Sequence, residues 1–319
     1  MSERGWIERY FAPLARAPGA ARLSDDTAEL SRQAGPVVIT TDAMIEGVHF
    51  LASDPVESLA RKLVRVNVSD ILSSGALPLE ALLVLGWPSD RTEANLAAFA
   101  GALGAELEAW GISLIGGDTV SAPGGLFLSL TLTGACIADA PVRRGGAAPG
   151  DELWITSEIG GARRGFLARA AGQQSPHISQ LLEPVIPGPG AARLLAAHAS
   201  AAMDVSDGLL GDLVSLARAS GCGAQLALDD VAFADQAATL DEALDLATWG
   251  DDYQLLFAAP AGSRERLETD ALSCGVRISR IGRLTAGSGL GVTWLGARVN
   301  LPETLGFEHG RIGASPTRP

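Results

Sequence analysis

Carboxylate side chains recur in this sequence beside glycine, serine or threonine, where apolar stretches end or helices are expected to begin. The aspartates in this setting are Asp26, Asp42, Asp70, Asp118, Asp204, Asp207, Asp251 and Asp252. One or two would be ordinary helix caps or turns. A set this large suggests bound cations that offset carboxylate repulsion. Oxygen ligands favour Mg²⁺ or Ca²⁺ over zinc, and protein-bound Mg²⁺ commonly works together with substrate phosphates. The acids therefore indicate an enzyme acting on a nucleotide or phosphate ester.

One stretch combines several of these features. Residues Pro36–Ile39 are apolar and mostly β-branched, which predicts a short buried strand. Thr40–Asp42 follow directly, and ligands bind beyond such strand ends in open α/β sheets. Gly47 permits a tight turn, and His49 lies between two apolar residues. The composition of this stretch fits a ligand site and an ordinary polar turn with a core histidine about equally well.

Known phosphate-binding motifs are missing from the sequence. It contains neither a Walker A loop nor the protein-kinase motifs, and Lys62 is the only lysine. Gly116-Gly117-Asp118 follows an expected short strand, Ile112–Ile115, and its backbone N–H groups could approach a phosphate closely. Arg143 and Arg144 are a candidate phosphate clamp, because a guanidinium can bind two oxygens at once. A solvated pair in a linker explains the two arginines equally well.

Composition limits the class of protein. The chain has 319 residues, of which 47% are hydrophobic and 19% charged, so a folded protein with a substantial core is expected. The net charge of -13 argues against a nucleic-acid partner. Cys136, Cys222 and Cys274 are widely spaced and suggest neither zinc nor disulfides. The first residues lack a signal-peptide pattern, and no apolar run approaches the ~20 residues of a membrane span, so we expect a cytoplasmic protein.

Helix-like and strand-like stretches alternate, which predicts an α/β (α+β) fold. Asp139-Ala140-Pro141 is the expected boundary between an N-terminal domain, residues 1–138, and a C-terminal α/β domain, residues 139–319. Strands are expected at 80–86, 112–115, 128–133, 152–156, 224–228, 253–258 and 276–281. Helices are expected at 6–15, from 54–55 to about 73, and at 92–110, 162–171, 190–199 and 209–220, with helices filling the remaining gaps. The proline-rich residues 173–189 are expected to form a long loop.

Seven sequence blocks, in order along most of the chain, resemble the thiamine-monophosphate kinases. That family belongs to a superfamily with aminoimidazole ribonucleotide synthetase and selenophosphate synthetase. The blocks are Ser24-Asp25-Asp26; Thr40-Thr41-Asp42 with Gly47-Val48-His49-Phe50; Val66-Asn67-Val68-Ser69-Asp70; Gly116-Gly117-Asp118-Thr119; Arg144-Gly145-Gly146 with Pro149-Gly150-Asp151; Met203-Asp204-Val205-Ser206-Asp207-Gly208; and Gly250-Asp251-Asp252-Tyr253. Each block is weak alone, but seven in register are a strong signal.

The resemblance implies Mg²⁺-dependent transfer of a phosphoryl group from ATP to thiamine monophosphate, giving thiamine diphosphate by direct in-line attack. It implies two α/β domains, with the N-terminal sheets of two subunits pairing into a barrel, and hence a homodimer. The implied Mg²⁺ ligands are Asp26, Thr40, Thr41, Asp42, Asp70, Asp118, Asp204 and Asp207. The implied ATP contacts are Gly117, Asp118, Arg144 and Ser206, the substrate contacts are His49, Asp251, Thr304 and Phe307, and Asp42, Asp118, Arg144 and Asp204 are the expected catalytic residues.

The sequence departs from the family pattern at four places. Ser24 and Trp249 stand where glycine is usual, and Asp251 replaces a glutamate that is one methylene longer. Thr304 stands where the family often has a tryptophan, for which Phe307 is a candidate substitute. The metal and ATP positions thus agree better than the substrate positions. Two alternatives remain open: another superfamily enzyme acting on a different phosphorylated small molecule, and a non-enzymatic metal-binding or scaffold protein.

Overall fold

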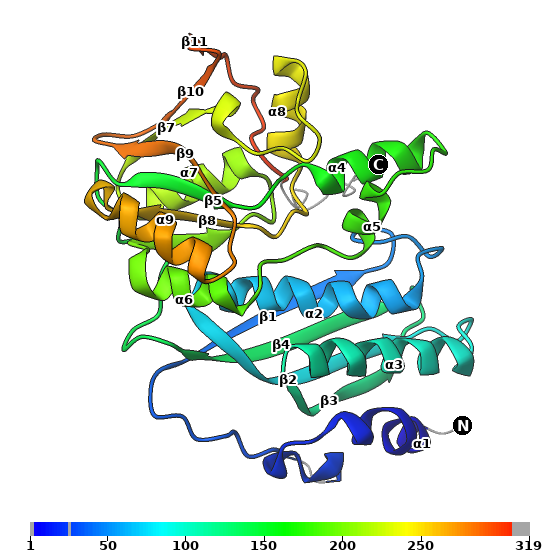
Figure 1. Cartoon of the computed structure of the whole chain (residues 1–319). Coiled ribbons are helices and arrows are strands. Elements are labelled where there is room, and N and C mark those ends of the chain that lie inside the picture. Colours follow the sequence, from blue (N-terminus) through cyan, green and yellow to red (C-terminus); the bar gives the residue numbers. More distant parts are fainter. Residues whose placement is uncertain (1–2, 25–26, 308–319) are drawn as a thin grey trace. The chain divides into compact units, whose positions relative to one another are not determined.

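The computed structural model of the protein describes residues 3–24 and 27–307 (Figure 1). These residues form two compact units, which are described separately. Unit 1 consists of the residues up to Ile71 together with Leu77–Ala135, and unit 2 of Leu72–Ala76 together with the residues from Cys136 onward. Each unit has its own β-sheet with helices, so the architecture is mixed α/β as predicted. Within the described residues, no helix has the length and apolar character needed to cross a membrane.

Unit 1 contains a four-stranded sheet in the order β1-β4-β2-β3. Its elements are α1 (Glu3–Trp6), η1 (Ile7–Phe11), η2 (Ala12–Leu14), η3 (Pro18–Leu23), β1 (Val37–Ile45), α2 (Val56–Ser73), β2 (Ala76–Trp87), α3 (Glu93–Ala109), β3 (Ser113–Ser121) and β4 (Phe127–Cys136). β1 runs antiparallel to β4, and β2 runs parallel to β3. The alternation in β4 is confirmed, since Leu128, Leu130 and Leu132 are fully buried.

The opposite face of this sheet carries several exposed apolar side chains. Ile39 is 69% exposed, and Ile45 and Leu82 are also exposed. Thr41, Ser129 and Thr131 share this face, because Thr41 pairs with Thr131 and alternates with the inward residues of β1. We refer to this side as the open face of unit 1.

Two predicted strand ends in unit 1 are wrong. β1 does not stop at Ile39 but continues through Thr40–Asp42 to Ile45, because an unbroken antiparallel ladder with β4 extends the pairing. β3 likewise continues through Gly116-Gly117-Asp118 to Ser121, paired with β2. The register of that pair shifts at Ala81/Leu82, and a Cβ on Gly117 would lie 1.8 Å from the Leu83 carbonyl oxygen. The glycine thus lets the strand pass where the sequence suggested a loop.

Unit 2 contains a seven-stranded sheet in the order β11-β10-β7-β9-β5-β8-β6. Its elements are β5 (Glu152–Thr156), α4 (Gly161–Ala170), α5 (His177–Leu182), α6 (Pro189–His198), β6 (Ala201–Asp204), α7 (Leu209–Ala219), β7 (Gly223–Ala227), η4 (Leu228–Asp230), α8 (Leu240–Trp249), β8 (Leu255–Ala259), η5 (Ala261–Ser263), α9 (Arg264–Ser273), β9 (Ile278–Thr285), β10 (Leu290–Trp294) and β11 (Ala297–Arg298). β10 runs parallel to β7, whereas the other pairs are antiparallel.

The core of unit 2 lies between the sheet and helices α7 and α8, where Leu213, Leu246 and Leu256 pack in one cluster. Helices α6 and α9 lie on the other side of the sheet, over β5 and β8 (Figure 1). One expectation for this unit is wrong, since α5 forms inside the expected loop 173–189. β10 and β11 lie beyond the last expected strand, in a region for which no element was predicted. The short β-hairpin of β10 and β11 is stabilised by pairing with β7, a long-range contact that local sequence does not reveal.

Candidate functional site

The acidic cluster of unit 1 is built by β1 and α2. Thr40 Oγ1 donates a hydrogen bond of 2.5 Å to Asp70 Oδ2, and the backbone N–H of Asp42 donates to Asn67 Oδ1 at 3.2 Å. Asn67 is held in turn by a bond from its Nδ2 to the Leu63 carbonyl at 2.9 Å. Asn67 and Asp70 are three positions apart on α2, so one face of the helix presents both side chains to β1.

The two carboxylates of this cluster affect each other. Burial, and secondarily the negative charge of Asp70, raises the pKa of Asp42 to about 6. A carboxylate in this environment is stabilised by a cation, since a cation offsets both the lost hydration and the repulsion. Thr40, Asp42 and Asp70 together offer hard oxygen atoms of the kind that Mg²⁺ binds. Within the described parts of the chain, no three acid, histidine or cysteine side chains form a complete metal site by themselves.

The structure places Thr41 and His49 beside this cluster in different ways. The Thr41 side chain is on the open face, where its Oγ1 donates to the Leu130 carbonyl at 3.2 Å and accepts from Thr131 at 3.0 Å. His49 lies in the turn after β1, and its Nδ1 accepts a hydrogen bond from the Ile45 N–H at 3.1 Å. Gly47, at φ +80°, forms that turn. The other imidazole nitrogen, Nε2, is then the one that carries the proton in the neutral ring.

Asp118 is not brought to Asp42 within one chain. Asp118 lies on β3, where it pairs with Val84 of β2, and β3 is the edge strand opposite β1. Three strand spacings of ~4.8 Å therefore separate β3 from β1. The Asp118 side chain is exposed, and its Oδ1 accepts a hydrogen bond from the Thr119 N–H at 2.9 Å. Gly117 precedes it at the close approach to β2.

In unit 2, two loops that follow β6 and α8 interlock. The N–H of Asp251 donates to the Ser206 carbonyl at 2.9 Å, and that of Tyr253 donates to the Val205 carbonyl at 2.8 Å. A Cβ on Gly250 would lie 2.3 Å from the Ser206 oxygen, and one on Gly208 would lie 2.8 Å from the backbone of α8. Both glycines have positive φ, +88° and +125°. The close contact of these loops therefore requires glycine at both positions.

Asp212 is a residue of this region that the sequence did not identify as functional. It lies in the first turn of α7, is 3% exposed, and its Oδ2 accepts hydrogen bonds from the N–H groups of Asp207 and Gly208, each at 3.1 Å. Burial and the charge of Asp207 raise the pKa of Asp212 to about 7, while the positive charge of Arg144 acts in the opposite direction. Asp212 thus fixes the Asp207 loop, and Arg144 is close enough to act electrostatically on Asp212. The only sequence signal was an acid in the first turn after a glycine.

Asp252 is one of two buried acids in the second loop. Its Oδ1 accepts a hydrogen bond from Gly160 N–H at 2.8 Å, at the start of α4, and its Oδ2 is buried without a hydrogen-bond partner among the described residues. Burial is the main reason that the pKa of Asp252 is raised to about 7. Neighbouring Asp251, at φ +63°, is also buried, and its Oδ1 accepts from the Tyr253 hydroxyl at 3.2 Å.

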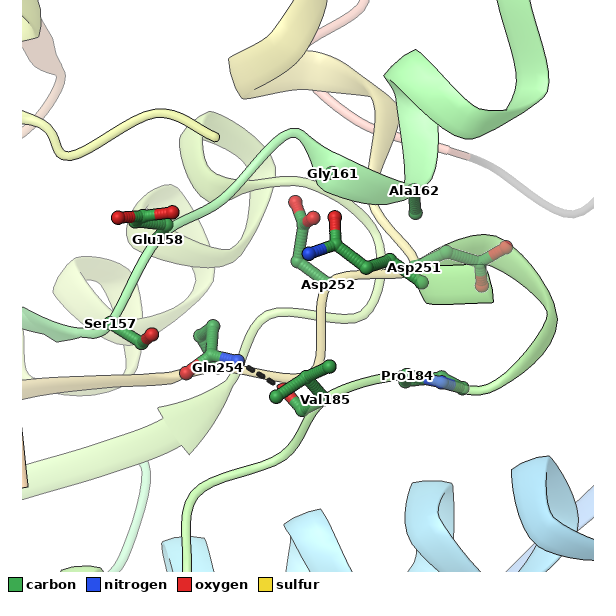
Figure 2. Close-up of a pocket in the computed structure, with 10 residues that line it drawn as sticks. Ser157, Glu158, Gly161, Ala162, Pro184, Val185, Asp251, Asp252 and Gln254 are labelled. Carbon is green, nitrogen blue, oxygen red and sulfur yellow. Dashed lines mark hydrogen bonds between the residues drawn. The ribbon is translucent and has the colours of Figure 1, made fainter. Parts of the chain in front are cut away.

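A small polar hollow of about 60 Å³ lies beside these two acids. Figure 2 shows Asp252 facing the start of α4, with Glu158 and Gln254 around the hollow. Gln254 is held by its bond to the Val185 carbonyl and by one from the Thr156 hydroxyl. The carboxyl groups of Glu158, Asp251 and Asp252 are among the groups that line the hollow, so it suits a ligand group that carries N–H or O–H donors.

The remaining predicted residues lie at the end of the described chain or outside it. Phe307 N–H donates to the Asp207 carbonyl at 2.8 Å, so Phe307 adjoins the first loop of unit 2. Thr304 is exposed, three residues before this contact. Asp204, at the end of β6, is 7% exposed. Asp26 lies outside the described residues.

Comparisons with known proteins agree with this arrangement of motifs. A family described as AIR synthase related protein, N-terminal domain, matches residues 24–136, and AIR synthase related protein, C-terminal domain, matches residues 148–295. The thiamine-monophosphate kinase of Caulobacter vibrioides is 37% identical over 316 residues, covering 95% of this chain and 90% of the relative.

Two solved structures are similar over most of their length. The thiamine-monophosphate kinase of Stenotrophomonas maltophilia K279a superposes with a TM-score of 0.78 at 32% identity, covering 84% of this chain and 89% of the other. AaThiL, solved in complex with AMPPCP and TMP, superposes with a TM-score of 0.75 at 28% identity, covering 88% and 90%. From its domains, its relatives and its motifs, this chain belongs to the thiamine-monophosphate kinase family.

Proposed function

We propose that the protein is a cytoplasmic kinase that transfers the γ-phosphoryl group of ATP to thiamine monophosphate, forming thiamine diphosphate and ADP. The observation that carries this proposal is the cluster of Thr40, Asp42 and Asp70, in which a family motif forms a partly buried group of oxygen ligands beside α2. The relatives described above support it, since AaThiL was solved with AMPPCP and TMP.

Mg²⁺ fits the oxygen atoms of this cluster. We propose that Thr40, Asp42 and Asp70 of unit 1 are Mg²⁺ ligands, and we propose the same role for Asp204 and Asp207 of unit 2. Asp26, Thr41 and Asp118 stay candidate ligands. Bound Mg²⁺ would neutralise phosphate charge, and two carboxylates together with substrate phosphates are a usual Mg²⁺ environment. The raised pKa of Asp42 supports this role, because it shows a carboxylate whose charge is not compensated by the protein alone.

The chain's own residues would act by positioning and by electrostatics. An oxygen of the acceptor phosphate attacks the γ-phosphorus, the bond from that phosphorus to the β,γ-bridging oxygen breaks, and ADP leaves with the electron pair. A phosphate-monoester oxygen is already nucleophilic, so no strong general base is needed. Arg144 would offset charge that develops on the transferred group. Asp212 keeps the Asp207 loop in place for this step.

We assign ATP contacts to Gly117, Asp118, Arg144 and Ser206. We assign acceptor contacts to His49, Asp251, Thr304 and Phe307. The hollow beside Asp251 supports the second assignment, because its acceptor atoms suit a group bearing N–H donors. We further propose that residues 1–138 form the nucleotide-binding and dimerisation domain and residues 139–319 the second domain.

A homodimer is part of the proposal. The open face of unit 1 exposes Ile39, Ile45 and Leu82, and β1 and β3 are both edge strands of its sheet. An apolar sheet face of this kind is normally covered, and a second copy of the same sheet would cover it and satisfy the edges. The two sheets would then form a barrel between the subunits.

The test is product formation by the purified protein with Mg²⁺ and ATP. Thiamine monophosphate should yield thiamine diphosphate and stoichiometric ADP, whereas unphosphorylated thiamine should not react, because an alcohol lacks the attacking phosphate oxygen and would need a base. An Arg144→Lys variant should lower kcat strongly and change the KM for ATP less. A charge-matched control at the exposed Arg266, Arg266→Lys, should leave both kcat and KM unchanged. Absence of thiamine diphosphate, or phosphorylation of thiamine itself, would refute the assignment.

A further inference from the structure

A second hollow lies on the sheet of unit 2, over the strands β7, β9, β10 and β11. Its volume is about 620 Å³, which lies within the range of roughly 300–1,000 Å³ typical of small-molecule sites. The charged residues that line it are Arg280, Arg283, Arg298 and Asp230. We call it the arginine groove. None of its lining residues belongs to the family motifs.

Strand register explains why the groove forms. Gln225 of β7 pairs with Arg283 of β9 on one side and with Gly291 of β10 on the other, so these three residues form one row across the sheet. In the next row Ala227 pairs with Thr293, which pairs with Arg298. Across the four strands β11-β10-β7-β9, the small residues Gly291 and Ala227 therefore lie on the two inner strands, and Arg283 and Arg298 lie on the two outer strands. The hollow is the space above these small residues.

The arginines of the groove are unusual in a chain with a net charge of -13. Other arginines of unit 2 are neutralised by ion pairs, such as Arg163 with Asp245 and Arg277 with Glu158. Within residues 3–24 and 27–307, neither Arg280 nor Arg298 has an ion-pair partner. Asp230 is the single acid of the groove.

Arg283 is held in a fixed orientation. Its Nε and Nη2 both donate to Gln225 Oε1, at 3.1 and 3.0 Å, while its other N–H groups are not used in this contact. A guanidinium positioned by a neutral amide keeps its full charge and loses less side-chain entropy when an anion binds. The groove thus combines a preoriented arginine with two further arginines that lack acidic partners.

We propose that the arginine groove is a binding site for a small anion that carries two or more phosphate groups. Guanidinium groups match phosphate geometry and can each form two parallel hydrogen bonds. Three arginines against one aspartate leave an excess positive charge for such a ligand. The site is separate from the acid-bearing loops, so its occupation does not depend on the proposed kinase reaction.

The test is a calorimetric titration of the full chain with inorganic triphosphate at low salt, without Mg²⁺ and without thiamine monophosphate. The double variant Arg280→Gln/Arg298→Gln should bind triphosphate about 100-fold more weakly, because each charge-assisted contact that is removed weakens binding about tenfold. The double variant Arg266→Gln/Arg277→Gln removes the same charge from elsewhere in unit 2 and should bind like the wild type.

Three results would overturn the proposal: no saturable binding to the wild type, equal binding by both double variants, or tighter binding of hexa-aspartate than of triphosphate. The last would identify an acidic peptide as the preferred occupant. Because no substrate or product of the kinase reaction is measured, failure of this test is distinct from failure of the proposed function.

Discussion

The buried carboxyl group of Asp252 should make the stability of unit 2 depend on pH. Burial raises its pKa in the folded protein from 3.8 to about 7. A carboxyl group whose pKa is higher in the folded state than in the unfolded state stabilises the fold fully when the pH is below its unfolded pKa. This stabilisation is lost as the pH rises through its folded pKa. The carboxylate therefore destabilises the fold at neutral and alkaline pH and not in acid.

The size of this effect follows from the two pKa values. At pH 5 the unfolded state has already released this proton almost completely, whereas the folded state keeps it until the pH approaches about 7. With about 1.4 kcal/mol for each pKa unit, the folded state loses about 3 kcal/mol relative to a variant that does not titrate. Burial has the largest influence on this pKa; the backbone N–H groups at the start of α4 lower it, and the negative charge of Asp251 raises it.

The assay is urea unfolding of the wild type and of Asp252→Asn at pH 5, 6, 7 and 8. Asparagine keeps the acceptor for Gly160 N–H but cannot ionise. The stability of the variant relative to the wild type should rise by about 3 kcal/mol across this range. An Asp139→Asn variant, at an exposed position, should follow the wild type. A relative stability of Asp252→Asn that is flat with pH, or that falls, would refute the reasoning.

The remaining predictions concern the acidic cluster of unit 1, the loops of unit 2 and the proposed dimer. Asp42→Asn should lower turnover at least about 100-fold while the apo protein becomes no less stable, since carboxylate repulsion is relieved; near-wild-type kcat would contradict this role. Gly250→Ala should lower the free energy of unfolding by more than about 2 kcal/mol, on the order of a buried steric conflict, because its Cβ would lie 2.3 Å from the Ser206 oxygen. The control Gly172→Ala, also at positive φ but in open space, should lower it by about 1 kcal/mol, and equal losses in urea unfolding would exclude the interlock. Ile39→Asp, at a 69% exposed position, should convert the proposed dimer to folded monomers in sedimentation experiments, and an unchanged dimer would exclude this face.

Local sequence predicted most elements, because apolar periodicity and capping residues specify them. The helix after Asp54-Pro55 was expected to end near Ser73, and α2 does end there. Asn67 and Asp70, three positions apart on this helix, both contact β1. These features depend on residues within one helical turn of each other, so they are visible in a single sequence.

The features that were missed depend on distant pairing or on burial. β3 passes through Gly117 because β2 offers it hydrogen bonds, and β10 forms because β7 lies beside it. Asp212 resembles any acid near a helix start, and only its burial and its two backbone bonds show that it supports the Asp207 loop. The motifs of the candidate site were thus visible in the sequence, whereas the contacts that support them were not.

The interlocked loops of unit 2 have a consequence for how its sequence can vary. The Asp207 loop is joined to the Asp251 loop through Ser206, and to the end of the described chain through Phe307. Three segments that are far apart in sequence therefore behave mechanically as one body, and a shift of one moves the other two. A substitution that suits one segment must also suit its two neighbours. Adaptation of this region to a new acceptor would then proceed by paired changes across the segments rather than by single replacements.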